Sequence, residues 1–126
     1  MPELAKPIKA TIYHHTKCSK SNAALGLLLE QGVDVSIVHY LETPLSLDSL
    51  KKLLRQLGID AKHLIRFAEP TAKELGISID DNRDENQWLA FMIQYPVLIE
   101  RPIVVINNKA IIARPAERVF DLIRNS

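Results

Sequence analysis

The stretch TIYHHTKCSKSN, residues 11–22, gathers side chains suited to nucleophilic chemistry. It holds the single cysteine of the chain, Cys18, with His14 before it and Lys17 and Lys20 on either side. The stretch follows a strand-like run and precedes a helical pattern, which predicts that Cys18 lies at the N-terminus of a helix. Unpaired N–H groups and the positive end of the helix dipole favour a thiolate there. We therefore predict a reactive thiol with a lowered pKa, to which His14 could add positive charge or a hydrogen bond.

Other interpretations of this stretch stay open or fail on residue types. Cys18 could be an ordinary buried thiol. A zinc site made from His14, His15 and Cys18 would lack a fourth ligand from a second Cys/His cluster, and neighbouring residues on a strand point to opposite faces. A phosphate-binding loop is excluded, because no Gly-rich element ends in Gly-Lys-Ser or Gly-Lys-Thr.

Three arginines stand at predicted element boundaries and could bind an anion beside the thiol. Arg66 lies in LIRFAEP, Arg101 in IERPIVV and Arg114 in IARPAE. Arg101 and Arg114 each precede a proline, which favours an extended or turn conformation for them. If all three converge on Cys18, their guanidinium groups would form a cage for a tetrahedral oxyanion. The alternative is that they are solvated surface residues.

The elements that must position these residues begin with a βαβ unit. Residues 9–14 are predicted as a strand from their β-branched and aromatic side chains. A helix should follow from Ser19 or Ser21 and end at Gly32, with Leu28 and Leu29 on its apolar face. Residues 33–41 predict a second strand, parallel to the first because a helical crossover joins the two.

Helical patterns dominate the segment of approximately 43–100, which we predict to be an insertion. One helix should be capped by Ser46 and end at Gly58. Another should have Asn82 and Glu85 as its N-terminal capping pair and stop at Pro96.

The chain then returns to strands at residues 102–106 and 109–113, separated by an Asn-Asn turn typical of a hairpin. A closing helix with Pro115 in its first turn should cover the sheet.

Composition predicts one domain, residues 1–126, able to bury a core: hydrophobic residues make up 47% and charged residues 25% of the chain. A formal charge of +1 gives no general attraction to nucleic acid or to an anionic membrane surface. No apolar run approaches the length of a membrane-spanning helix, and no leader resembling a signal peptide opens the chain. With a single cysteine, these features indicate a reducing cytoplasm.

The order of elements predicts an α/β, thioredoxin-like (glutaredoxin-like) fold, with a mixed four-stranded sheet and a helical insertion. The stretches YHHTKCSKS, YLETP, LGI, LIRFAEP, YPVLIERPIVV and ARPAE occur in the order and spacing found in one family. Through them the chain resembles the glutaredoxin-coupled arsenate reductases, the ArsC family, from Ile12 to Ile123. The resemblance implies a cis peptide bond at Pro102.

The resemblance also implies a mechanism. Cys18 would be the nucleophile, His14 would lower its pKa, and Arg66, Arg101 and Arg114 would bind and polarise arsenate. Glutathione as co-substrate and glutaredoxin as partner would complete reduction to arsenite, with no bound cofactor. A monomer with a role in arsenic detoxification is expected.

The chain departs from the family pattern at two places. Family members commonly read His-Asn-Pro-x-Cys and carry an arginine four residues after the cysteine, where this chain has His15-Thr16 and Asn22. Two alternatives therefore stay open: a glutathione-linked thiol transferase acting on another substrate, and a non-catalytic regulator similar to the Spx relatives. The regulators usually carry Cys-x-x-Cys, whereas this chain has Ser21 at the second position.

Overall fold

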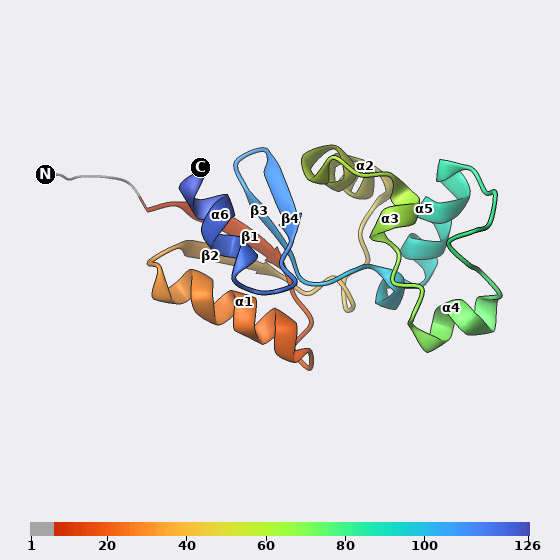
Figure 1. The fold of residues 1–126 in the computed structure, drawn as a ribbon, viewed down its shortest axis with the longest axis horizontal. Helices are drawn as coiled ribbons and strands as arrows, with labels where there is room; N and C mark the ends of the chain where they lie inside the picture. Colours follow the sequence, from red (N-terminus) through yellow and green to blue (C-terminus); the bar gives the residue numbers. More distant parts are fainter. Residues whose placement is uncertain (1–6) are drawn as a thin grey trace, which may run out of the picture. The chain divides into compact units, whose positions relative to one another are not determined.

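The computed structural model describes residues 7–126 (Figure 1). They form two compact units, one made of the chain up to His39 together with Arg101–Ser126, the other of Tyr40–Glu100. The second unit covers the segment predicted as a helical insertion. Residues 1–6 of the predicted single domain lie outside the described residues.

A mixed four-stranded sheet in the order β2-β1-β3-β4 forms the centre of the first unit. β1 (Lys9–Tyr13) pairs in parallel with β2 (Asp34–Val38), and α1 (Ser19–Glu30) connects the two. On its other side β1 pairs antiparallel with β3 (Ile103–Ile106), which continues through a turn into the antiparallel β4 (Lys109–Ile112). Asn107 in this turn has a φ of 57°, a conformation that asparagine tolerates. The predicted α/β class with a mixed four-stranded sheet is confirmed.

The core of the first unit lies between one face of the sheet and the helices α1 and α6 (Arg118–Arg124) (Figure 1). Alternate strand residues such as Ala10 and Ile12 point to this face, as the two-residue period of a strand requires. They share one apolar cluster with Leu28 of α1 and Val119 of α6. This packing holds the start of α1 against the end of β1, where Cys18 lies.

Two predicted details of these helices are wrong. Leu29 is predicted on the buried face of α1 but is 58% exposed, because the buried positions follow Ser21, Ala24 and Leu28 and the next residue turns away from the sheet. Regular helix α6 begins at Arg118 instead of Pro115. The N–H of Arg118 bonds to the carbonyl of Pro115 at 3.1 Å, three residues back, so the chain makes a tighter turn before the helix.

The second unit consists of the helices α2 (Leu47–Leu57), α3 (Ala61–Leu64), α4 (Pro70–Leu75) and α5 (Glu85–Gln94), and a single 3-10 turn, η1 (Pro96–Leu98). The predicted ends of α2 are confirmed: the Ser46 hydroxyl accepts the N–H of Ser49 at 3.1 Å, and Gly58 ends the helix with a φ of 70°. The stop of α5 before Pro96 is also confirmed.

The N-terminal capping pair of α5 is Asp84 and Gln87, which corrects the predicted Asn82 and Glu85. The Asp84 carboxylate accepts the N–H of Gln87 at 2.8 Å, and the Gln87 side chain accepts the N–H of Asp84 at 3.0 Å. Asp84 is the residue immediately before the helix, and its short side chain therefore reaches the third helical N–H. Asn82 lies two residues further out.

The Asp84 cap leads to a prediction about stability. Replacing Asp84 with alanine should lower the free energy of unfolding by about 1 kcal/mol, because the N–H of Gln87 loses its acceptor. Urea unfolding measures the change. Asp80→Ala is the matched control, since Asp80 is an exposed acidic residue before the same helix and makes no side-chain cap. Equal losses in the two variants would contradict a specific cap.

Candidate active site

Cys18 occupies the N-cap position of α1, directly after the loop that leaves β1. Its backbone is extended, with φ −97° and ψ 119°, and the N–H of Asn22 bonds to its carbonyl at 3.0 Å as the first helical hydrogen bond. At the end of β1 the loop is held to the sheet by the backbone N–H of His14, which donates to the carbonyl of Val38 on β2 at 2.9 Å. The predicted position of Cys18 at a helix N-terminus is confirmed.

The surroundings of Cys18 lower its thiol pKa below the usual value. Burial acts in the opposite direction and raises the pKa. The N–H groups of Ser21 and Lys20, and a hydrogen bond and positive charge from Arg101, together outweigh it. Cys18 stands at the N-cap position, which serine or aspartate often occupies, although its side chain forms no capping hydrogen bond of regular geometry. The predicted direction of the shift is confirmed.

His14 lies beneath the loop and is only 4% exposed. Its Nδ1 is 2.5 Å from the Ser21 hydroxyl, and its ring meets that of His39 edge-on at 6.1 Å between centroids. Burial, followed by the positive charges that His39 and His15 can carry, lowers the pKa of His14 and favours the neutral ring. The groups that lower the pKa of Cys18 are those of Ser21, Arg101 and Lys20. The predicted role of His14 in tuning the thiol therefore stays a prediction.

The structure brings one of the three predicted arginines into contact with Cys18. The Arg101 side chain lies near enough to the thiol to lower its pKa, through a hydrogen bond and through its positive charge. Arg114 follows β4 in the same unit and is partly exposed, and within residues 7–126 its side chain makes no hydrogen bond or ion pair. Arg66 belongs to the second unit, where its guanidinium lies 3.8 Å from the Glu69 carboxylate. A cage that includes Arg66 and Arg114 stays a prediction.

Two residues near the start of α1 make contacts that the sequence analysis did not assign. Ser21 is fully buried, although serine in a first helical turn is usually solvated. Asn22 donates its side-chain amide to the carbonyl of Thr16 at 2.9 Å and so closes the loop around Cys18. One sequence signal could have drawn attention to Ser21. It lies three residues after the predicted N-cap, a position whose backbone N–H points toward the capping side chain.

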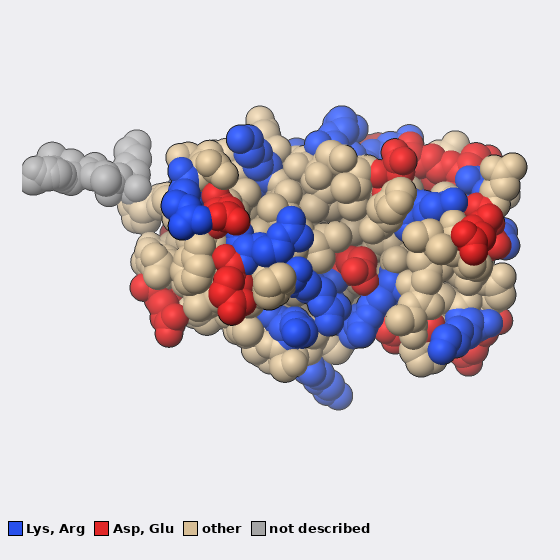
Figure 2. All heavy atoms as spheres, viewed as in Figure 1, with Lys and Arg blue, Asp and Glu red and all other residues tan. Residues whose placement is uncertain are grey.

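Positive charge surrounds the start of α1. Figure 2 shows Lys and Arg atoms gathered over this end of the helix, and Lys17 of the preceding loop and Lys20 of the first turn are exposed. An anion approaching Cys18 thus meets an attractive local field in a chain of nearly balanced net charge.

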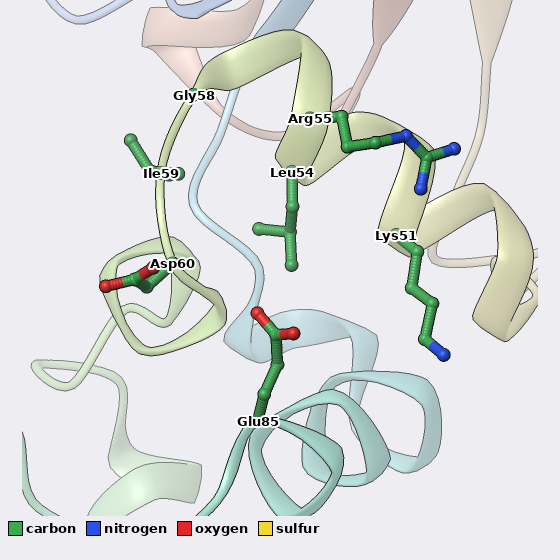
Figure 3. A pocket seen from close by; sticks show the side chains of 7 residues that line it. All are labelled: Lys51, Leu54, Arg55, Gly58, Ile59, Asp60 and Glu85. Carbon is green, nitrogen blue, oxygen red and sulfur yellow. The ribbon is translucent and has the colours of Figure 1, made fainter.

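The second unit contains hollows of its own. Figure 3 shows one of about 420 Å³, lined by Lys51, Leu54, Arg55, Gly58, Ile59, Asp60 and Glu85. An adjoining hollow of about 490 Å³ shares Asp60 and Glu85 with it. None of the predicted site residues lines either hollow.

Two further observations concern residues 7–126 only. They contain no group of three or more His, Cys, Asp or Glu side chains placed to hold a metal ion. None of the helices there is both long enough and apolar enough to cross a membrane.

The first unit has the arrangement of a thioredoxin-like fold: βαβ followed by ββα, with a cysteine at the start of the first helix. The Arg101–Pro102 bond is cis, as expected at this position, and so is Arg114–Pro115. The chain belongs to the ArsC family, whose model matches residues 13–122.

The relatives of this chain extend over nearly its whole length. It is 43% identical to the uncharacterized protein YfgD of Escherichia coli strain K12, over 95% of this chain and 99% of that protein. It is 40% identical to a protein named arsenate reductase from Neisseria meningitidis, over 94% and 97% of the two chains. The structure of arsenate reductase from Vibrio cholerae superposes with a TM-score of 0.87 at 40% identity, covering 92% of this chain and 98% of the other.

Proposed function

We propose that this protein reduces arsenate to arsenite, with Cys18 as the nucleophile and external thiols as the source of electrons. The observation that carries the proposal is the place of Cys18 at the N-terminus of α1, with Arg101 of the same unit among the groups that lower the pKa of its thiol. A group that can hold an oxyanion thereby lies beside the sulfur that would attack it. The names of the relatives from Neisseria and Vibrio point to the same substrate.

Arg101 and Arg114 would hold the arsenate oxygens, and Arg66 would complete the cage. Guanidinium groups suit this task because they present paired N–H donors and keep their charge at every physiological pH. Arg114 supports this role, since its side chain has no hydrogen-bond or ion-pair partner within residues 7–126.

The reaction would begin when the Cys18 thiolate attacks arsenic. A sulfur–arsenic bond forms, an arsenic–oxygen bond breaks, and the oxygen leaves as water after protonation. Glutathione then attacks the adduct. A disulfide forms between Cys18 and glutathione as the sulfur–arsenic bond breaks. The two sulfur atoms together lose two electrons, which arsenic gains, and arsenite is released.

The resulting disulfide requires a thiol from outside this chain for its removal. The sequence contains a single cysteine, and Ser21 stands where a resolving cysteine of a Cys-x-x-Cys motif would be. Glutaredoxin is the proposed partner for this step, and no resident cofactor is needed. We propose a monomer that works in the reducing cytoplasm, where glutathione is present.

A coupled assay tests the proposal. Purified protein should support arsenate-dependent consumption of NADPH in the presence of glutathione, glutaredoxin and glutathione reductase, and omission of either the protein or glutaredoxin should stop it. No turnover in a protein whose Cys18 is still rapidly alkylated near neutral pH would contradict arsenate as the substrate. That result would instead favour glutathione-linked thiol exchange on another substrate.

A further inference from the structure

Ser21 connects the buried His14 ring with the thiol through two different groups. Its hydroxyl oxygen lies 2.5 Å from His14 Nδ1 and 3.2 Å from the backbone nitrogen of His15. Its backbone N–H belongs to the first turn of α1, which begins directly after Cys18, and it is among the groups that lower the pKa of that thiol. The residue is 0% exposed, so water does not supply alternative partners to its hydroxyl.

Counting donors and acceptors around this hydroxyl determines the tautomer of His14. The N–H of His15 can only donate, which means that the Ser21 oxygen accepts from it. The single hydroxyl hydrogen then needs an acceptor, and Nδ1 of His14 is the one that Ser21 contacts within residues 7–126. If Nδ1 carried a proton, the oxygen would accept twice and its own hydrogen would be buried without a partner, which is costly.

We propose that Ser21 is a positioning residue that donates its hydroxyl hydrogen to Nδ1 of His14, keeps this ring in the Nε2–H tautomer, and thereby fixes the first turn of α1 against the thiolate of Cys18. As a statement about catalysis this inference rests on the proposed function. Its direct consequence concerns the thiol alone: the Nδ1 lone pair is occupied and does not take the Cys18 proton. His14 acts on Cys18 through the position of Ser21.

The groups that face His14 are consistent with a neutral ring in this position. His39 meets it edge-on, His15 is its neighbour in the chain, and the Ser21 hydroxyl contacts its Nδ1. No carboxylate occurs among the groups that influence its charge, so nothing acidic favours a second ring proton.

Nitrogen-15 NMR of the His14 ring in the unaltered protein tests the tautomer directly. Above the pKa of His14, two-bond and three-bond correlations should show a protonated Nε2 and an unprotonated Nδ1. A protonated Nδ1 would overturn the inference. This measurement requires no variant and no arsenate, and it therefore stands even where the proposed function fails.

The effect on the thiol is tested by alkylation of Cys18 as a function of pH. Ser21→Ala should shift the profile to higher pH and slow alkylation at neutral pH about two- to tenfold, the change expected from one lost neutral hydrogen bond. Ser19→Ala is the matched control, because Ser19 lies in the same helical turn, is exposed, and makes no side-chain hydrogen bond within residues 7–126. An unchanged profile for Ser21→Ala would overturn the positioning role.

A double-mutant cycle separates coupling from general loosening of the loop. If His14 acts through Ser21, the His14→Ala, Ser21→Ala double variant should shift the alkylation profile no further than the larger single shift. Additive shifts would overturn the inference. The two results can also differ. If the double variant shows the expected non-additive shift but the unaltered protein does not turn over arsenate, the inference about Ser21 stands and only the proposed function is contradicted.

Discussion

Arsenate-dependent turnover will be abolished when Cys18 is replaced by serine, and the fold will be retained. A serine hydroxyl does not ionise near neutral pH, whereas the surroundings of Cys18 lower the pKa of its thiol. Serine is also a preferred N-cap, so its oxygen can accept the backbone N–H groups that now stabilise the sulfur. The serine cap stabilises the helix by about 1 kcal/mol or less, and loss of the attraction between the thiolate and the helix dipole destabilises it by a similar amount. Because the two effects oppose each other, the free energy of unfolding should change little.

The same replacement should remove a pH dependence of stability. Because the folded pKa of Cys18 is lowered, the folded state releases the thiol proton at a lower pH than the unfolded chain does. The thiol's contribution to stability is therefore fully present above the unfolded pKa of about 8.5 and is lost as pH falls through the folded pKa. Urea unfolding across this range should show stability rising with pH in the unaltered protein and a weaker rise in Cys18→Ser.

Ser19→Ala provides the control for the Cys18 experiments, since it changes the same helical turn without touching the sulfur. It should keep both turnover and the pH dependence. Full activity of Cys18→Ser would remove the thiolate mechanism, and a steep loss of stability in that variant would contradict the replacement cap.

The fold was largely predictable because local rules and packing agree in this chain. β-branched runs became the strands, and Ser46 and Gly58 bound α2 as their intrinsic preferences indicate. The error at the start of α5 arose because two residues could satisfy the same local rule. Asn82 and Asp84 are both residue types that cap helices. Which of them is the cap depends on where the first turn of the helix begins, and the apolar periodicity locates that start only to within a few residues.

The candidate site was predictable to the extent that it depends on one helix end. The place of Cys18 follows from a strand, a loop and a helix in sequence order. The approach of Arg101 to the thiol depends on how β3 pairs beside β1, more than eighty residues along the chain. The place of Arg101 at a predicted element boundary made this approach possible, and the resemblance to a known family implied it. The contact of His14 with Ser21 was missed because a buried serine leaves no mark in a pattern of apolar residues.

Arg101→Ala should produce the second large effect, and it should act on two measurable quantities. Loss of a charged hydrogen bond to the oxyanion should weaken anion binding by about 1.5–3 kcal/mol. The pKa of Cys18 should rise as well, because Arg101 lowers it through both a hydrogen bond and its charge. At neutral pH less thiolate is then present, so the variant should react more slowly with iodoacetamide even without arsenate.

Three variants distinguish these two effects of Arg101 from a general change in charge. Protection of Cys18 by arsenate against alkylation measures anion binding, and the pH profile without arsenate measures the thiol. Arg124→Ala removes the same charge from an exposed position on α6 and should change neither quantity. Arg114→Ala should weaken protection and leave the profile in place, because Arg114 is not among the groups that shift the Cys18 pKa.

Arg101→Lys completes the comparison, since lysine keeps the charge and loses the paired donors of the guanidinium. It should recover part of the thiol reactivity and little of the anion binding, because a point charge stabilises a thiolate but cannot grip two oxygens of a tetrahedral anion. Equal recovery of both quantities would mean that charge alone explains the role of Arg101. Unchanged protection in Arg101→Ala would place the oxyanion elsewhere and contradict the observation on which the proposed function depends.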